Sequence, residues 1–387
     1  MPTEPFARRV AQSATERANT GVEGVVVEHV TTVELHRIRI PLVAPFRTAH
    51  GVQHDRDVVL IAARDREGRV GWGECVAMNS PAYSPEYADG AAHVLEHHLV
   101  PAVLADGDAA AIAGHPMAKA ALEVALLDLG LQRADRRLVD ELGGHGGPVA
   151  VGAVVGITPS IEDLLIEVGR RVAEGYTRIK LKIRPGWDRE PLAAVRTEHP
   201  TLALWADANG DYGEEHLADL CALDDLGLGL IEQPFAADEL MLHAALAETL
   251  DTPVCLDESV TSVGSLRTAI EIGACDALNI KAGRVGGLRI ALQLVTICRE
   301  HDIDAWCGGM LETGIGRAAN LALATVPGIT LPGDLSASAR YFERDLTAPF
   351  ELGQGGTLAP PAGPGIGIAP DPDALAAFTT SVRTIHS

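Results

Sequence analysis

The run Arg178-Ile-Lys-Leu-Lys-Ile183 opens the stretch that decides the fold, and the run Leu278-Asn-Ile-Lys-Ala-Gly-Arg284 closes it. Between them lie three short apolar runs, and an acidic residue ends each one. These acids and the lysine of the closing run follow one another at intervals of 24 or 25 residues. One strand, one helix and two loops need this length, so the interval predicts a parallel β/α barrel with charged residues at one end of consecutive strands. The acids are Asp207, Glu232 and Asp257.

The three acids are predicted to form a metal site. Unpaired carboxylates are too costly to bury in apolar surroundings, so they cannot belong to the packed interior of the barrel. Converging carboxylates repel one another unless a cation binds them, and hard oxygen ligands suit Mg²⁺. The alternative is that the acids are helix N-caps. Glu232 argues against it, because this acid stands just before Pro234 and belongs to the strand, whereas Asn209 fits a cap as well as a site residue.

Lysines flank the predicted metal site. Lys180 and Lys182 are two residues apart on a strand, so they share one face, which we expect to be the barrel interior near its mouth. Mutual repulsion and a nearby Mg²⁺ would lower their pKa and favour a neutral base. Two lysines on an exposed edge strand are the alternative, and the acids downstream argue against it. Lys281 is expected across the site, which suits removal of an α-proton from one face, stabilisation of the enediolate by the cation, and return of the proton to either face.

Composition excludes several classes of partner. The chain has 387 residues, of which 47% are hydrophobic and 22% charged, and a formal net charge of −22. Nucleic acids and anionic membranes are bound through basic patches, so neither is an expected partner. No apolar run approaches the roughly 18 residues of a membrane span. The six cysteines show no C-x-x-C spacing, which predicts reduced core residues in a cytoplasmic protein. The expected partner is a small-molecule carboxylate.

The chain divides into four predicted parts. Residues 1–23 have mixed charge and no apolar segment, which indicates a disordered extension. Residues 24–147 contain three strands followed by two helices, an α+β capping domain. Residues 148–338 alternate strands and helices and form the catalytic barrel, with Gly328–Leu331 as the eighth strand. Residues 339–387 return to the capping domain. The predicted fold class is α/β, a (β/α)7β TIM-like barrel with an α+β capping domain built from the N-terminal part and the C-terminal tail.

Two long connections stand out in the capping domain. Residues 41–55 carry Phe46, and residues 74–85 carry Tyr83. Connections of this length without secondary structure are often functional lids. At the other end of the chain, the pattern predicts a short helix near 372–382.

Four further runs carry a family resemblance. They are Gly71-Trp-Gly-Glu-Cys-Val-Ala-Met78, Tyr83-Ser-Pro-Glu-Tyr-Ala-Asp-Gly-Ala-Ala-His93, Gly308-Gly-Met-Leu-Glu-Thr-Gly-Ile-Gly-Arg317 and Leu331-Pro-Gly-Asp-Leu-Ser-Ala-Ser338. With the paired lysines, the three acids and Lys281, they resemble the enolase superfamily in its muconate-lactonising branch. Within that branch, they resemble the o-succinylbenzoate synthase / N-acylamino acid racemase group. The resemblance covers residues 25 to about 370.

The resemblance implies roles for the matching residues. The three acids would bind Mg²⁺, with Mn²⁺ or Co²⁺ able to substitute. Lys182 would be one acid/base, tuned by Lys180, and Lys281 would be the opposite acid/base. Arg284 resembles a residue that supports the site from behind in racemase-type members. We also expect a homo-oligomer.

The resemblance also implies a substrate pocket. The loops that carry Phe46 and Tyr83 would cap the barrel and shape the pocket for the side chain of the substrate. The end of the seventh strand would meet its acyl part. The residues implied there are Met310, Glu312, Thr313 and Ile315.

The favoured function is racemisation of N-acyl, especially N-succinyl, amino acids by Lys182 and Lys281. The alternative is syn-dehydration to o-succinylbenzoate, a lyase step of menaquinone biosynthesis, in which Lys182 abstracts the proton and Lys281 stabilises the anion. Both reactions use the same residues, so one protein could do both. The intact set of lysines and acids argues against a third alternative, a non-catalytic binding protein. Mandelate racemases place a histidine where this chain has Lys281, and dipeptide epimerases carry Asp-x-Asp where it has Asp334-Leu-Ser336.

Overall fold

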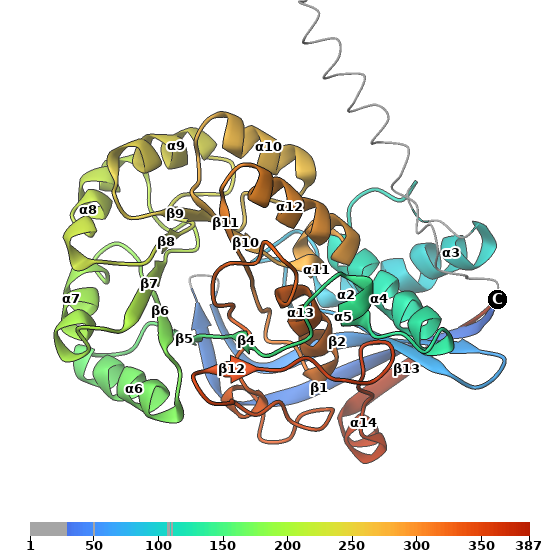
Figure 1. Ribbon diagram of the computed structural model, residues 1–387. Helices are drawn as coiled ribbons and strands as arrows, with labels where there is room; N and C mark the ends of the chain where they lie inside the picture. The colour runs from blue at the N-terminus through green and yellow to red at the C-terminus, as the bar shows by residue number, and fades with distance from the viewer. Residues whose placement is uncertain (1–28, 49–50, 107–108, 110) are drawn as a thin grey trace, which may run out of the picture.

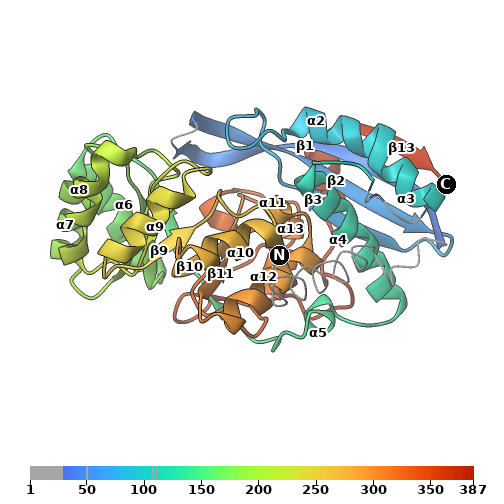
Figure 2. The same cartoon turned by 90° about the horizontal axis from the view of Figure 1, so that it is seen from above.

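The computed structural model of the protein describes residues 29–48, 51–106, 109 and 111–387, so the predicted extension over residues 1–23 lies outside the described part. A curled sheet of parallel strands has an arc of helices on its outer side, and a long antiparallel sheet with its own helices lies beside it (Figures 1 and 2). No helix among the described residues is long and apolar enough to cross a membrane.

The parallel strands form one curled sheet in the order β11-β10-β9-β8-β7-β6-β5 (Figure 1). The strands are β5 (Ala153–Val155), β6 (Arg178–Lys182), β7 (Ala203–Asp207), β8 (Ile231–Glu232), β9 (Val254–Leu256), β10 (Ala277–Ile280) and β11 (Asp304–Cys307). The helices that follow them along the chain are α6 (Ile161–Glu174), α7 (Arg189–Glu198), α8 (Leu217–Cys221), α9 (Leu240–Thr249), α10 (Val263–Glu271), α11 (Ala282–Val285), α12 (Leu288–Glu300) and α13 (Gly314–Ala324). Alternation of strand and helix keeps neighbouring strands parallel, and the predicted β/α barrel is confirmed.

The predicted eighth strand is the part of the barrel that differs. Gly328–Leu331 is not a strand, and an irregular segment follows β11 instead. Its backbone still joins both sides of the sheet: Thr330 N–H donates to Ala305 O at 2.8 Å, and Gly152 N–H donates to Gly333 O at 2.8 Å. Pro332 has no N–H to donate, so a regular strand cannot continue through this segment.

The antiparallel sheet has the order β13-β1-β2-β3 and belongs to the capping part (Figure 2). Its strands are β1 (Val30–Thr48), β2 (Gly51–Asp65), β3 (Val70–Cys75) and β13 (Thr379–His386). The prediction of an open loop over residues 41–55 is wrong, because β1 and β2 continue as a paired ladder up to Thr48 and Gly51. The predicted C-terminal helix is too long. It is α14 (Pro372–Phe378), after which β13 pairs with β1.

The sheet of the capping part connects two apolar cores. On β2, Val58, Leu60 and Ala62 are buried in the core that also contains the barrel, while Val59 and Ile61 are buried in the core of the capping helices. This alternation follows from the period of two along a strand. The helices of the capping part are α2 (Ala88–Val94), a π-helical turn (Leu95–Leu99), α3 (Val100–Asp106) and α4 (Pro116–Arg133), followed by the short α5 (Leu138–Glu141); β4 (Val149–Ala150) pairs with β12 (Thr357–Leu358).

Helix α4 lies directly against β3 because glycine leaves room for it. A Cβ atom on Gly73 would lie 2.0 Å from the carbonyl oxygen of Ala121, and a Cβ atom on Gly71 would lie 2.1 Å from that of Ala125. The Gly-x-Gly of β3 is therefore needed for close packing of the helix on the sheet.

Candidate active site

Strand β6 carries a row of three cations into the barrel. Arg178, Lys180 and Lys182 alternate with apolar residues, and all three side chains are buried. Their spacing of two places them on one face of the strand, as predicted for the lysines. The sequence holds only four lysines, and three of them line one cavity.

The three predicted acids end neighbouring strands. Asp207 is the last residue of β7 and is paired in register with Glu232, the last residue of β8. Asp257 follows β9 directly. All three side chains are at most 1% exposed. The strands therefore deliver them to the same end of the barrel.

Each lysine of β6 is bound to carboxylates. The Nζ of Lys180 lies 3.0 Å from Asp207 Oδ2, 2.6 Å from Asp334 Oδ2 and in direct contact with Glu232. The Nζ of Lys182 donates to Asp207 Oδ2 at 2.6 Å and to Asn209 Oδ1 at 2.5 Å. Asp207 thus connects the two lysines.

The third lysine reaches the cavity from the end of β10. The Nζ of Lys281 donates to Asp257 Oδ2 at 2.6 Å and to the hydroxyl of Tyr83 at 3.2 Å. Arg284 contacts the other oxygen of Asp257 and donates to the carbonyl oxygens of Asn279 and Val260. Arg284 therefore holds Asp257 from behind.

Neighbouring groups shift the pKa values of two of the lysines. Burial alone would lower the pKa of Lys180, but three neighbouring carboxylates outweigh burial and raise it above its ordinary value. The pKa of Lys281 is also raised, because Tyr83 and nearby carboxylates outweigh burial. Attraction to the acids therefore exceeds repulsion between the ammonium groups, while the lowering that a nearby Mg²⁺ would cause stays a prediction.

The lysines and acids line a cavity of about 90 Å³. Several predicted residues meet there: the three lysines, Asp207, Asn209, Tyr83 and Met310. Glu232 and Asp257 lie beneath it and contact Lys180 and Lys281. Three more lining residues come from segments predicted to shape the pocket: Gln53 from residues 41–55, Met78 from residues 74–85 and Leu311 from the end of the seventh strand. The lining residues that were not predicted are Val154, Gly309, Asp334 and Tyr341.

Other predicted residues lie elsewhere. Glu312 accepts hydrogen bonds from Met310 N–H at 2.6 Å and from Asn320 Nδ2 at 2.8 Å, so it shapes the loop before α13. Thr313 caps α13 and donates to Glu74 at 2.6 Å, and Ile315 is fully buried in the apolar core. The side chain of Phe46 lies outside the described part of the chain.

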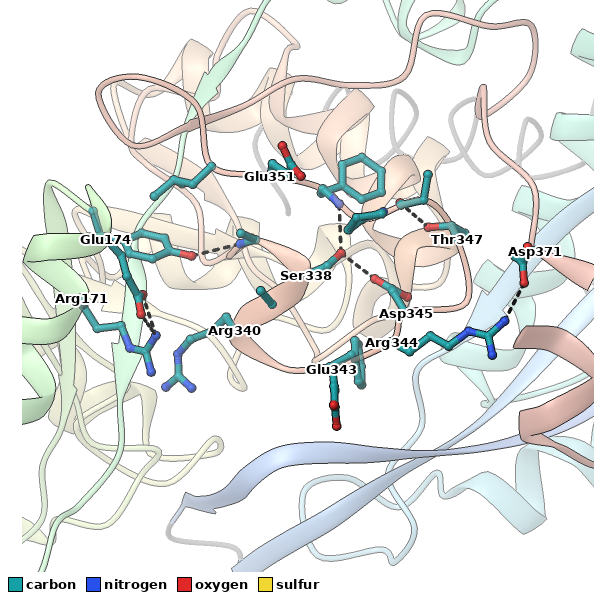
Figure 3. A pocket seen from close by; sticks show the side chains of 18 residues that line it. Arg171, Glu174, Ser338, Arg340, Glu343, Arg344, Asp345, Thr347, Glu351 and Asp371 are labelled. Carbon is teal, nitrogen blue, oxygen red and sulfur yellow. Dashed lines mark hydrogen bonds and ion pairs between the residues drawn. The ribbon is translucent and has the colours of Figure 1, made fainter. Parts of the chain in front are cut away.

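A larger cavity, of about 840 Å³, lies between the end of α6 and residues 337–352 (Figure 3). It shares no residue with the lysine cavity, and no lysine lines it. Two ion pairs join charged side chains of its lining, Arg171 with Glu174 and Arg344 with Asp371. Size alone therefore does not make it the candidate active site.

Comparison with known proteins identifies the family. Residues 30–143 match the N-terminal domain of the mandelate racemase / muconate lactonizing enzyme family, and residues 163–374 match the enolase C-terminal domain-like family. The chain belongs to the enolase superfamily. An N-succinylamino acid racemase from Amycolatopsis sp. is 49% identical, over 92% of this chain and 99% of the relative. An o-succinylbenzoate synthase from Geobacillus stearothermophilus is 42% identical, over 92% of this chain and 98% of the relative.

Solved structures agree with this family. A member of the enolase superfamily from Listeria innocua has a TM-score of 0.88 and 38% identity, and the match covers 92% of this chain and 99% of that one. The resemblance predicted from the sequence is confirmed.

Enolase-superfamily enzymes use a divalent metal ion, typically Mg²⁺. Within residues 29–48, 51–106, 109 and 111–387, no three acidic, histidine or cysteine side chains converge as ligands of one ion. The reason is visible in the contacts, because lysines and Arg284 each turn a carboxylate toward themselves. The carboxylates of Asp207, Glu232 and Asp257 still suit a hard cation, because they are buried oxygen ligands. Close to them, Glu258 Oε2 is buried and has no hydrogen-bond partner.

Sequence reasoning missed two acids of this enolase-superfamily site. Asp334 lies in the segment that replaces the eighth strand, and Glu258 directly follows Asp257. Glu258 accepts a hydrogen bond from Asn209 Nδ2 at 3.0 Å, so it is linked to Lys182 through Asn209. The adjacent acids Asp257-Glu258, and an acid directly after Pro332-Gly333, were the available signals.

Proposed function

We propose that this protein is a divalent-metal-dependent racemase of N-acyl amino acids, with N-succinyl amino acids as favoured substrates. One observation carries the proposal: Lys182 and Lys281 line one cavity from different strands, each bound to its own buried carboxylate. Two bases on separate elements suit a reaction that removes a proton from one face of a carbon and returns it to the other. The likeness to the Amycolatopsis racemase supports this choice.

The proposed metal ligands are Asp207, Glu232 and Asp257, with Mg²⁺ as the ion and Mn²⁺ or Co²⁺ able to replace it. All three carboxylates are buried at the same end of the barrel, which supports the assignment. A bound divalent cation supplies positive charge that lowers the pKa of nearby lysines and stabilises negative charge on the substrate carboxylate.

The proposed acid/base pair works from two sides. Lys182 takes the α-proton from one enantiomer, and Lys281 gives a proton to the opposite face; the roles exchange for the other enantiomer. Lys180 lies beneath Lys182 on β6 and adds positive charge where the enediolate forms. Tyr83 and Met310 line the cavity and would meet the rest of the substrate.

The second candidate is o-succinylbenzoate synthase, or an enzyme with both activities. The 42% identity to the Geobacillus synthase supports it, and the same lysines and acids would serve. In that reaction Lys182 would abstract the proton, and Lys281 would only stabilise the anion.

The remaining proposals concern the setting of the enzyme. All six cysteines are free, which supports a reducing, cytoplasmic location. The homo-oligomer stays a prediction from the sequence. We keep residues 24–147, 148–338 and 339–387 as the proposed capping domain, catalytic barrel and returning segment.

The experiment that tests the function is proton NMR of N-succinyl-L-phenylglycine with enzyme and Mg²⁺ in D₂O, with chiral analysis of the product. Loss of the α-proton signal together with formation of the D enantiomer is the expected result. Absence of exchange would reject the racemase for this substrate. A dehydration assay that follows o-succinylbenzoate then tests the second candidate.

A further inference from the structure

Lys180 contacts three carboxylates, and only two of them are proposed metal ligands. Asp207 and Glu232 are proposed metal ligands, and a cation would compete with Lys180 for their oxygens. The third partner is Asp334, whose Oδ2 lies 2.6 Å from Lys180 Nζ. Asp334 is the one of the three that carries no proposed role in metal binding, so it stays available to the lysine.

Asp334 is itself fixed by an anchored cation. Arg178 lies 2.5 Å from Asp334 Oδ1 and donates to the carbonyl oxygen of Pro332 at 2.7 Å. The guanidinium group stacks over the ring of Trp205 at 4.3 Å from its centroid and is 1% exposed. A buried, stacked guanidinium with two polar partners has little freedom, and this holds the carboxylate in place.

The barrel leaves room for this arrangement. A Cβ atom on Gly152 would lie 2.3 Å from the guanidinium of Arg178, so only glycine fits there. Lys180 Nζ also lies 4.6 Å from the centroid of the Trp306 ring, on the side of the barrel where Asp334 follows β11. Arg178, Asp334 and Lys180 thus form a continuous buried chain of charges, which we call the Arg178–Asp334–Lys180 chain.

We propose that Asp334 is a positioning residue for Lys180: it gives the ammonium group a partner outside the metal site, so that a divalent cation can displace Lys180 from Asp207 and Glu232. The proposal rests on the metal ligands assigned under the proposed function. Without Asp334, Lys180 would turn fully to the two remaining carboxylates and compete with the cation for them. In this proposal Asp334 acts on the ion only through Lys180.

A double-mutant cycle tests this coupling without any substrate. Mg²⁺ affinity is measured by calorimetry on wild type, Asp334→Asn, Lys180→Met and the double variant. We expect Asp334→Asn to weaken Mg²⁺ binding about tenfold when Lys180 is present, the lower end of losses caused by residues behind metal ligands. In the Lys180→Met background, where no ammonium group competes, we expect the same change to have a several-fold smaller effect.

Two outcomes overturn the proposal. Equal weakening in both backgrounds would mean that Asp334 acts only as a distant negative charge, and no weakening in either would mean that Lys180 needs no partner. Asp345→Asn is the matched control, because it removes a buried carboxylate that contacts Ser338 and not Lys180. Its Mg²⁺ affinity should equal that of wild type.

A second variant covers the case in which Asp334→Asn does not fold. Arg178→Lys keeps the positive charge but lacks the planar guanidinium group that holds Asp334. Like Asp334→Asn, it should therefore weaken Mg²⁺ binding, and the loss should be smaller in the Lys180→Met background. Failure of the proposed function looks different. A wild type that binds Mg²⁺ and shows the coupling, yet neither racemises nor dehydrates its substrates, would reject the function and leave the positioning role intact.

Discussion

Among single residues, the lysines give the sharpest test of the two-base proposal. We expect Lys182→Met and Lys281→Met each to lower racemisation by about 10²–10⁴-fold, the usual contribution of a positioned acid or base. Each variant should still exchange the α-proton of one enantiomer, and the two variants should prefer opposite enantiomers. Proton NMR of both enantiomers in D₂O measures this.

The chain provides its own control at this scale. Lys119 is the only lysine outside the cavity, so Lys119→Met changes the same residue type without touching the site. It should keep both exchange reactions at wild-type rates. Unchanged racemisation in Lys182→Met or Lys281→Met would contradict the two-base proposal.

The strands that carry the site residues could be predicted from the sequence, but the side chains that these residues contact could not. The interval of 24 or 25 residues follows from local structure, and it brings Asp207 and Glu232 into register. The contact of Lys180 with Asp334 joins residues from opposite ends of the barrel domain, and it exists only because an irregular segment closes the barrel. The carboxylates of Asp207, Asp334 and Glu232 outweigh burial and raise the pKa of Lys180, and the sequence pattern did not reveal the part that Asp334 takes.

At the scale of elements, the segment that replaces the eighth strand is the most sensitive part of the barrel. A Cβ atom on Gly333 would lie 2.5 Å from the carbonyl oxygen of Cys307, which is backbone and cannot turn away. We expect Gly333→Ala to destabilise the fold by about 1–3 kcal/mol, as overpacking does, and to weaken Mg²⁺ binding by displacing Asp334. Thermal unfolding and calorimetry measure the two effects.

Gly169→Ala is the control for Gly333→Ala. Gly169 lies within α6, and a Cβ atom there would meet nothing within 4 Å. Alanine in a helix interior gains about 0.5–1 kcal/mol over glycine, so this variant should melt at or above the wild-type temperature. A melting temperature of Gly333→Ala equal to that of Gly169→Ala would show that the closing segment tolerates a side chain.

The two elements that sequence reasoning missed share a physical cause. Strand β13 is mostly exposed and carries polar residues on both faces, so it lacks the apolar alternation by which strands are recognised. Its β-branched threonines, valine and isoleucine favour a strand, but its partner β1 begins some 350 residues earlier in the chain. The closing segment Thr330–Asp334 likewise depends on the strands beside it, which no local pattern encodes.

For the molecule as a whole, buried acids at the boundary of the capping part link stability to pH. Glu74 on β3 accepts hydrogen bonds from backbone N–H groups at the start of α13, and Glu123 on α4 accepts one from the start of α12. Burial raises the pKa of each to about 7, despite these bonds. An acid with a raised pKa binds its proton more tightly in the folded state than in the unfolded chain, so folding becomes less favourable as pH rises.

We therefore expect the melting temperature to fall by a few degrees between about pH 5 and about pH 7, the range between the ordinary pKa of a glutamate and the raised values of Glu74 and Glu123. Buried His243 has its pKa lowered to about 4 and acts in the opposite direction over part of this range, but it is one group against two. Asp207 has a lowered pKa, and its contribution is complete well below this range. In the double variant Glu74→Gln/Glu123→Gln, the melting temperature should change less with pH than in wild type. High salt screens the net charge of −22, and it should leave the pH dependence of the wild-type melting temperature unchanged. If high salt removes the pH dependence of the melting temperature and the double variant keeps it, repulsion between surface charges is its cause instead.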